Sequence, residues 1–188
     1  MADIIMDEVF GELKYLKTKR WGKRMEAPLF NSDGNLILVV QDDNKEGILD
    51  VQREAYKIYL QNSDKYKDIA VDYLLDYYKW NYEYIAKVIC DLDENDHKDV
   101  ITETQLFEMI DLWSLYICRD GSFGYSFGCC WDDENDLAVL LSEEEPRVIS
   151  RTQLENLHKI NDDTIGLLVH YGKNAWKGWK KHSLFGKN

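Results

Sequence analysis

Proline, patterned cysteines and long apolar runs are all scarce in this 188-residue sequence. Only Pro28 and Pro146 interrupt the backbone, and no stretch approaches the roughly 18 apolar residues that a transmembrane helix needs. With 45% hydrophobic and 13% aromatic residues, the composition is that of a packed globule and not of a disordered chain. The length favours a single domain.

The four cysteines do not form the pattern of a disulfide-rich secreted domain. They are Cys90, Cys118, Cys129 and Cys130. Neighbouring residues of a strand point to opposite faces, so we expect that Cys129 and Cys130 do not pair with each other. Cys130 falls among small residues and is the better candidate for a reactive thiol. The first ten residues carry acids where a signal peptide has a basic region, so we expect a cytoplasmic protein.

Familiar catalytic motifs are also missing. The chain has no C-x-x-C pair, H-E-x-x-H helix, G-x-S-x-G elbow, P-loop or G-x-G-x-x-G turn, and its four histidines are far apart. Asp91, Asp93 and Asn95 match the start of a calcium loop. That pattern fails at Asp96, where glycine is needed, and at Thr102, where a glutamate is needed. We therefore expect no metal and no cofactor.

Basic residues are outnumbered by acidic ones, 23 against 35, which gives a net charge of -12. Such a field repels nucleic acid and attracts a basic partner. The last 16 residues are the exception: residues 173–188 hold five lysines and no acid, with Trp176 and Trp179 between them. Lys and Trp interleave in this way in nucleic-acid and membrane-surface segments. The first 172 residues carry a net charge of about -17, which attracts this basic segment. We therefore favour a contact of the segment within the chain or between subunits. We predict one domain over residues 1–172, a basic tail over 173–188, and neither a nucleic-acid nor a membrane partner.

The first forty residues carry strand patterns. Residues 8–17 alternate partly, and residues 20–30 are predicted to return as the hairpin partner after a turn near 17–19. Residues 32–35 form a strong turn signal, and the apolar run 36–40 suits a buried strand.

The middle of the chain carries helical spacing, over 48–62 and over about 64–90, with Ser63 as N-cap of the second helix. The long helix has a main apolar stripe and a second stripe on another side. The main stripe is Tyr66, Ile69, Ala70, Tyr73, Leu74, Tyr77, Tyr84, Ile85 and Val88, and the second is Val71, Leu75, Tyr78 and Tyr82. Thr102 and Gln105 form a capping box for a short helix that ends near Met109.

Period-two alternation returns in the C-terminal third. It runs through 113–118 and, after a turn at Asp120-Gly121, through 123–131, where bulky and small residues alternate. Further strands are predicted over 137–141 and 147–150, and residues 165–171 suit either a strand or a helical turn. The predicted fold class is α+β: an antiparallel sheet, made of an N-terminal hairpin and a C-terminal meander, packs against a central helical segment.

Two features indicate binding to a protein. Between Tyr66 and Tyr84 lie six tyrosines and a tryptophan, which are residue types enriched at interface hot spots. We expect most of them in the core, and Tyr78 and Tyr82 of the second stripe to be exposed. The other feature is an acidic turn that suits a basic partner better than catalysis, with Asp132, Asp133, Glu134 and Asp136 as its carboxylates.

Three short motifs resemble a group of uncharacterised bacterial domains. They are Asp7-Glu8-Val9-Phe10-Gly11-Glu12-Leu13, Trp21-Gly22 and Phe127-Gly128-Cys129-Cys130-Trp131-Asp132-Asp133-Glu134. Those domains begin with a D-x-x-F-G-x-L strand and a W-x-G hairpin and end with a C-x-W-D-E-E-H-G-x-G-V hairpin. The resemblance spans about residues 7–150. Since members often sit in loci with toxin and immunity genes, it implies a binding or neutralising role.

The sequence departs from this pattern after Glu134. The histidine of the group is Asn135 here, and its two glycines are Asp136 and Ala138. We therefore expect no chemistry that depends on this histidine. The motif is expected instead to shape a tight turn between two strands.

Our leading hypothesis is a non-enzymatic binding protein, in its most concrete form an immunity protein. It would cover the basic active site of a bacterial toxin, such as a nuclease, with an acidic, tyrosine-bearing surface. An alternative is an enzyme or small-ligand protein with a pocket between the meander and the long helix. A third is a subunit that self-associates through the aromatic helix. The sequence leaves its oligomeric state open.

Overall fold

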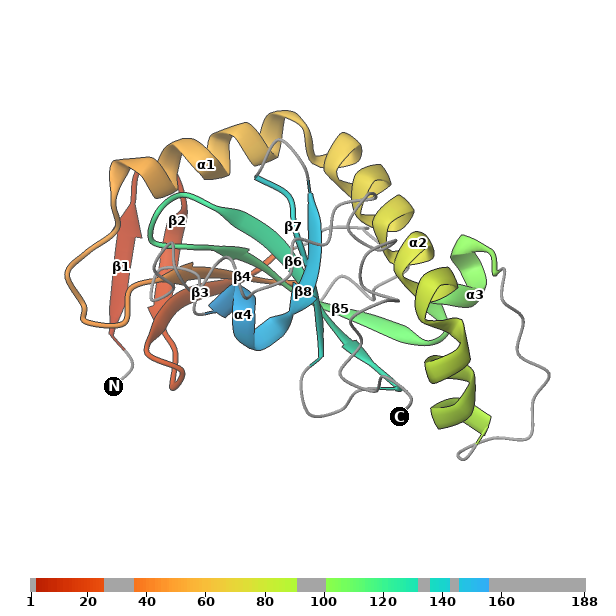
Figure 1. Cartoon of the computed structure of the whole chain (residues 1–188). Coiled ribbons are helices and arrows are strands. Elements are labelled where there is room, and N and C mark those ends of the chain that lie inside the picture. Colours follow the sequence, from red (N-terminus) through yellow and green to blue (C-terminus); the bar gives the residue numbers. More distant parts are fainter. Residues whose placement is uncertain (1–2, 26–35, 91–100, 132–135, 143–145, 156–188) are drawn as a thin grey trace, which may run out of the picture.

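The computed structural model describes residues 3–25, 36–90, 101–131, 136–142 and 146–155. They form one eight-stranded sheet with four helices, which confirms the predicted α+β class (Figure 1). The strands are β1 (Ile4–Asp7), β2 (Gly11–Tyr15), β3 (Arg20–Met25), β4 (Leu36–Gln41), β5 (Ile110–Ile117), β6 (Phe123–Cys129), β7 (Leu137–Leu140) and β8 (Arg147–Ser150). The helices are α1 (Asp50–Gln61), α2 (Ser63–Cys90), α3 (Glu103–Phe107) and α4 (Arg151–Glu155).

The strands lie in the sheet in their order along the chain. Six neighbouring pairs are antiparallel, and β4 and β5 are parallel, with Ile37 opposite Ser114 and Val40 opposite Ile117. Parallel neighbours need a long crossover, and the segment that holds α1, α2 and α3 provides it. The predicted N-terminal hairpin and C-terminal meander are both confirmed, but the parallel pair that joins them was not predicted.

The first predicted strand is wrong at its start, because the chain turns where continuous strand was expected. Asp7 ends β1, and its Oδ1 accepts hydrogen bonds from the N–H groups of Val9 (2.9 Å) and Phe10 (3.0 Å). Gly11 then begins β2 with φ of 73°, a conformation that glycine adopts readily. The carboxylate and the glycine together make a tight turn, so that Ile4–Asp7 pairs with Gly11–Lys14 as a separate hairpin.

The other predicted elements are confirmed with small shifts at their ends. Ser63 is the first residue of α2 and not its N-cap, and the Thr102 capping box does begin α3. Several predictions fall outside the described residues: the turn at 32–35, the calcium-like loop at 91–99, the segment 165–171 and the basic tail 173–188.

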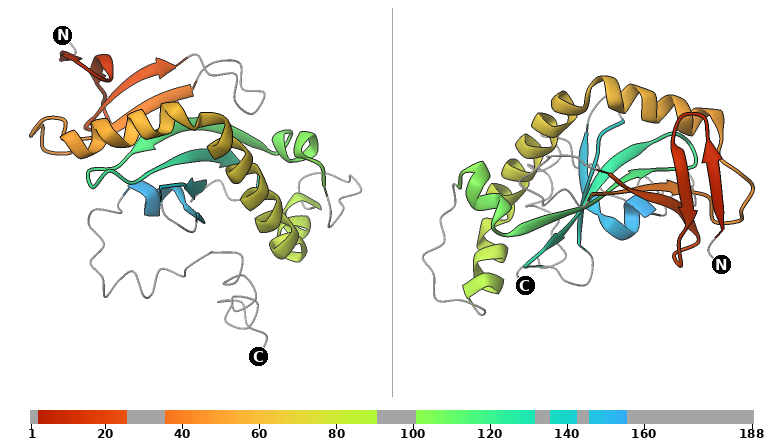
Figure 2. Two further views of the ribbon diagram at one scale, coloured as in Figure 1. Left: turned by 90° about the horizontal axis from the view of Figure 1, so that it is seen from above. Right: turned by 180° about the vertical axis from the view of Figure 1, so that it is seen from behind.

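One side of the sheet carries the main core. Helices α1 and α2 arch over this side, and α4 lies on the other (Figures 1 and 2). The strands contribute alternate residues to this core: Leu36, Leu38 and Val40 from β4, and Phe123, Tyr125 and Phe127 from β6. Tyr59 of α1 reaches the sheet, where the Tyr125 hydroxyl donates to its hydroxyl over 3.1 Å. Among the described residues, no helix is long and apolar enough to cross a membrane.

The other side of the sheet, which we call the open face, has a much smaller core. It consists of Tyr116, Cys118, Ala138, Leu140, Ile149 and Leu154, the last of these from α4. A β-bulge between Leu112 and Ser114 interrupts the alternation of β5. As a result Trp113, Ser114 and Tyr116 all border one cavity on the open face.

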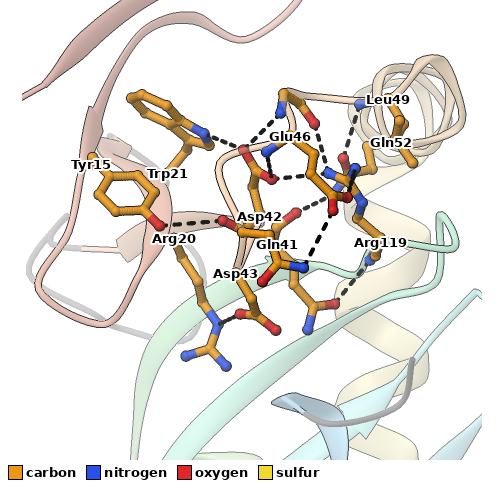
Figure 3. Close-up of polar contacts among 12 residues, drawn as sticks. Tyr15, Arg20, Trp21, Gln41, Asp42, Asp43, Glu46, Leu49, Gln52 and Arg119 are labelled. Carbon is orange, nitrogen blue, oxygen red and sulfur yellow. Dashed lines mark hydrogen bonds and ion pairs between the residues drawn. The ribbon is translucent and has the colours of Figure 1, made fainter. Parts of the chain in front are cut away.

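The parallel strands are joined at their carboxyl ends by the buried carboxylate of Asp42, 1% exposed, directly after β4 (Figure 3). Its Oδ2 accepts hydrogen bonds from Trp21 Nε1 (2.8 Å) and Gly47 N (3.1 Å). Its Oδ1 accepts from Glu46 N (2.9 Å) and from Arg119 Nη1 (3.1 Å), two residues beyond β5. Four donors therefore satisfy one carboxylate and hold three segments of the chain together.

Gln41 extends this network to α4, and its contacts with Gln52 and Arg119 are drawn in Figure 3. Its backbone carbonyl accepts from Gln52 Nε2 of α1 (2.9 Å), and its side-chain Oε1 accepts from the N–H of Arg119 (2.9 Å). Its Nε2 donates to the backbone carbonyl of Glu155 (3.1 Å). The carboxyl end of β4 thus positions α1, β5 and the last residue of α4.

Replacing Asp42 tests this network. We expect Asp42→Asn to lower the free energy of unfolding by about 3 kcal/mol, because it leaves the Arg119 guanidinium without its buried counter-charge. Glu46→Gln is the matched control, since Glu46 pairs with the same arginine through a carboxylate that is 60% exposed. Glu46→Gln should lower the free energy of unfolding by less than about 1 kcal/mol. Urea unfolding measures both, and equal losses would contradict the central role of Asp42.

The Asp7 turn predicts a loss of stability in acid. Burial by itself raises the pKa of the Asp7 carboxyl, but hydrogen bonds from Phe10, Arg53 and Val9 outweigh it and hold the pKa below 3.8. The unfolded chain therefore takes up this proton first as the pH falls below about 4, and stability declines. Asp7→Asn should be less stable at neutral pH and lose less stability between about pH 4 and pH 2. Urea unfolding at several pH values measures this dependence. If the free energy of unfolding of Asp7→Asn falls with pH as steeply as that of the wild type, the Asp7 carboxyl does not cause the acid sensitivity.

Candidate functional site

Tyr78, predicted to be exposed, is 1% exposed and belongs to the main core. Its ring meets Trp131 edge-on, with ring centres 6.2 Å apart, and lies 6.0 Å from the ring of Tyr82. Tyr82 itself is half-buried. The prediction for Tyr78 is wrong because Trp131, just beyond β6, packs against the second apolar stripe of α2. The main stripe is covered only in part, since Tyr73 and Tyr77 are half-buried.

Asp136, predicted to contact a partner, is engaged within the chain. It is 9% exposed, and its Oδ2 lies 3.4 Å from Arg151 Nη1 of α4. Its φ of 52° is in the left-handed region, which explains why the resembled domains have glycine at this position. The other predicted contacts of the acidic turn, Asp132, Asp133 and Glu134, lie outside the described residues.

A regular acidic row on α2 was missed at the sequence level. Asp64, Asp68, Asp72 and Asp76 follow one another at intervals of four, which puts them along one side of the helix. We call these four residues the acidic face. Asp64, Asp68 and Asp72 are exposed, and within the described part of the chain none of these three has a cation at ion-pair distance. The spacing of four is the signal of this row in the sequence.

The acidic face runs beside partly covered aromatic residues. Tyr73 follows Asp72, and Tyr77 follows Asp76, so that carboxylates and half-buried rings alternate along the same region of α2. Like charges four residues apart destabilise a helix by about 0.2–0.5 kcal/mol per pair. The carboxylates of Asp68 and Asp72 therefore repel each other along the helix, whereas Asp64 in the first turn suits the helix macrodipole.

The open face holds a cavity of about 530 Å³. The predicted alternative placed a pocket between the meander and the long helix, whereas this cavity lies on the side of the sheet away from that helix. Strand residues that border the cavity are Ile37, Val39, Trp113, Ser114, Tyr116 and Ser126. Charged residues come from β3 (Arg20), from β5 (Asp111) and from α4 (Arg151 and Glu155). A ligand pocket typically has a volume of this size.

Two arginines cover two aromatic rings of the cavity. The guanidinium of Arg20 lies 5.4 Å from the ring centre of Tyr116, and that of Arg151 lies 5.1 Å from the ring centre of Trp113. Both arginines meet the Glu155 carboxylate, at 3.5 Å from Arg20 Nη1 and 2.8 Å from Arg151 Nε. The side chain of Gln41 donates a hydrogen bond to the backbone carbonyl of Glu155, so the Asp42 network helps to position Glu155.

The hydroxyl of Tyr116 is buried and has no hydrogen-bond partner among the described residues. Burial raises the pKa of this phenol strongly, and the charge of Arg20 opposes the shift only in part. The hydroxyl is therefore protonated at neutral pH and able to donate. The nearby hydroxyls of Ser114 and Ser126, by contrast, hydrogen-bond to each other over 2.6 Å.

In the described part of the chain, Cys118, Cys129 and Cys130 are not in disulfides. Cys129 is buried and Cys130 is exposed, as expected of neighbours that point to opposite sides. Burial raises the pKa of the Cys118 thiol, which disfavours its reactive thiolate. Among the described residues, no three His, Cys, Asp or Glu side chains gather as metal ligands do.

The burial of Tyr78 predicts a structural and not a binding phenotype. Tyr78→Ala should lower the free energy of unfolding by about 3–5 kcal/mol, because it leaves a cavity against Trp131. Asp72→Asn, on the exposed side of the same helix, should change it by less than about 0.5 kcal/mol. Urea unfolding compares the two, and a Tyr78→Ala protein as stable as wild type would place the ring outside the core.

Comparison with known proteins identifies a family but no characterised relative. The family described as Domain of unknown function (DUF6985) matches residues 9–153, which include strands β2 to β8. No match was found among curated proteins or among solved structures. The matched region covers most of the chain and agrees with the resemblance to uncharacterised domains over residues 7–150. The chain therefore belongs to the DUF6985 family of domains of unknown function.

Proposed function

We propose that this protein is a non-enzymatic binding protein that docks a basic protein surface on the acidic face of α2. Its most specific form is an immunity protein that neutralises a bacterial toxin. The observation that carries the proposal is the row of exposed aspartates Asp64, Asp68 and Asp72, which have no cation at ion-pair distance in the described part of the chain.

The partner surface differs from the one expected from the sequence alone. Tyr78 is in the core and Asp136 pairs with Arg151, so neither supplies a contact. The acidic face, with Tyr73 and Tyr77 beside it, takes their place as a surface of carboxylates and partly covered rings. Such a surface suits a partner that presents lysines and arginines around an apolar patch.

The charge of the whole chain supports fast encounter with such a partner. A net charge of -12 creates a long-range field that attracts a basic protein, and the acidic face gives this field a local target. Charge complementarity of this kind raises the association rate at low salt more than it raises affinity. Inhibitors of intracellular toxins benefit from fast association, because the toxin acts as soon as it is free.

The toxin-neutralising form rests on the resemblance to domains found in toxin and immunity loci. It predicts that the protein forms a complex with the product of a neighbouring gene. Co-expression of the two proteins, followed by affinity purification of one, tests this form. A neighbouring product that is not basic, or that does not co-purify, would leave no support for toxin neutralisation.

Neutralising the acidic face tests the binding surface. We expect the triple variant Asp64→Asn, Asp68→Asn, Asp72→Asn to associate with the co-purified partner about tenfold more slowly at low salt. The matched control is Glu8→Gln, Glu12→Gln, Glu54→Gln, three exposed acids on other elements whose loss changes the net charge equally. Stopped-flow association at several salt concentrations measures both.

The control separates local from general charge effects. The proposal expects the control variant to keep most of the wild-type association rate and its salt dependence. If both triple variants slow association equally, the partner responds only to net charge and the acidic face is not the docking surface. If neither does, electrostatics does not guide the encounter.

A further inference from the structure

We propose that the cavity on the open face binds a small molecule with a flat apolar body and an oxygen atom that accepts hydrogen bonds. This binding site is separate from the acidic face, because the open face lies on the opposite side of the sheet from α2 (Figures 1 and 2).

The cavity exists because small residues line up across neighbouring strands. On the open face, Tyr116 of β5 is opposite Gly124 of β6, and Ser114 is opposite Ser126. A Cβ at Gly124 would lie 2.3 Å from the carbonyl oxygen of Val139, so that no larger residue fits at this position. Of these residues, Ser114 and Ser126 line the cavity, and their short side chains leave room there.

Trp113 is held against the edge of this space. A Cβ at Gly128 would lie 2.4 Å from the Trp113 ring, so only glycine lets the indole pack directly on β6. Arg151 covers the ring from α4, yet 40% of the Trp113 surface stays exposed. Ile37, also 40% exposed, borders the same cavity. Two large apolar side chains that remain open to one cavity favour a flat apolar ligand.

Two buried donors define the polar part of the ligand. The Tyr116 hydroxyl and Arg20 Nε belong to residues that line the cavity, and neither atom has a hydrogen-bond partner among the described residues. Tyr116 is 2% exposed, and the nearest carboxylate oxygen to Arg20 Nε, on Asp43, is 3.8 Å away. Buried donors without an acceptor are rare in folded proteins, because desolvation without a hydrogen bond is unfavourable. An acceptor oxygen on a ligand satisfies both requirements.

The charges around the cavity limit the charge of the ligand. Arg20 and Arg151 share the carboxylate of Glu155, and Arg151 also pairs with Asp136. Since these guanidinium groups already face carboxylates, the site needs no strongly anionic ligand. A neutral carbonyl or a single carboxylate supplies the acceptor oxygen that the donors lack, whereas an organic ammonium ion supplies none.

Ligand-detected NMR on the full chain tests this site with simple probes. We expect benzoate and benzamide, which share a flat ring and an acceptor oxygen, to show saturation transfer at concentrations up to about 10 mM. Benzylamine, which has the same ring with a cation, should show none. Absence of transfer from all three, or transfer from benzylamine alone, would overturn the proposal.

Removing one oxygen atom tests the role of the Tyr116 hydroxyl. Tyr116→Phe keeps the ring beneath Arg20 and should weaken benzoate binding about three- to tenfold. It should leave the melting temperature unchanged or higher, because the lost hydroxyl has no hydrogen-bond partner among the described residues. The matched control is Tyr15→Phe, whose hydroxyl donates to the Asp42 backbone carbonyl outside the cavity and should not affect benzoate.

The two readouts together decide the outcome. Unchanged benzoate affinity in Tyr116→Phe would show that the hydroxyl does not bind the probe. A melting temperature that falls as it does in Tyr15→Phe would show that the Tyr116 hydroxyl is already satisfied by a water molecule or another part of the chain. Either result would overturn the assignment of Tyr116 as a ligand donor.

Discussion

The buried Asp42 carboxylate is the interaction on which the rest of the structure depends. The sheet is made of two antiparallel halves, and only the parallel pair of β4 and β5 joins them. Asp42 closes this pair at its carboxyl end through Arg119, and the neighbouring Gln41 ties α1 and α4 to the same point. The long crossover through α1 and α2 starts directly after this cluster, so that its position sets where both helices lie over the sheet.

Fixing the two halves in one sheet creates two faces with different consequences. On the helix side, alternate bulky residues pack against α1 and α2, and burial of Tyr78 there leaves the acidic face as the outer surface of α2. On the open face, Ser114 and Ser126 leave room, and the short α4 brings Arg151 and Glu155 to the same cavity. The protein surface and the cavity that we propose for binding therefore follow from the same sheet.

Local patterns predicted the elements well, and long-range contacts account for what they missed. The alternation in residues 123–131 and the Thr102 capping box depend on neighbours in sequence, and both are confirmed. The parallel pair, the packing of Trp131 on Tyr78 and the pairing of Asp136 with Arg151 join distant residues, which one sequence does not reveal. The cavity could not be predicted from the sequence either, because it depends on which small residues of neighbouring strands lie opposite one another. The acidic face, however, was visible as a spacing of four.

The central claim is that the partner covers the acidic face of α2. Carboxylate labelling with a carbodiimide and glycine ethyl ester, read by mass spectrometry, measures the accessibility of each aspartate in the free protein and in the complex. The account predicts that labelling of Asp64, Asp68 and Asp72 falls on binding, while Glu8, Glu12 and Glu54 label as before. Unchanged labelling of the three aspartates, with protection of carboxylates on other elements, would contradict it.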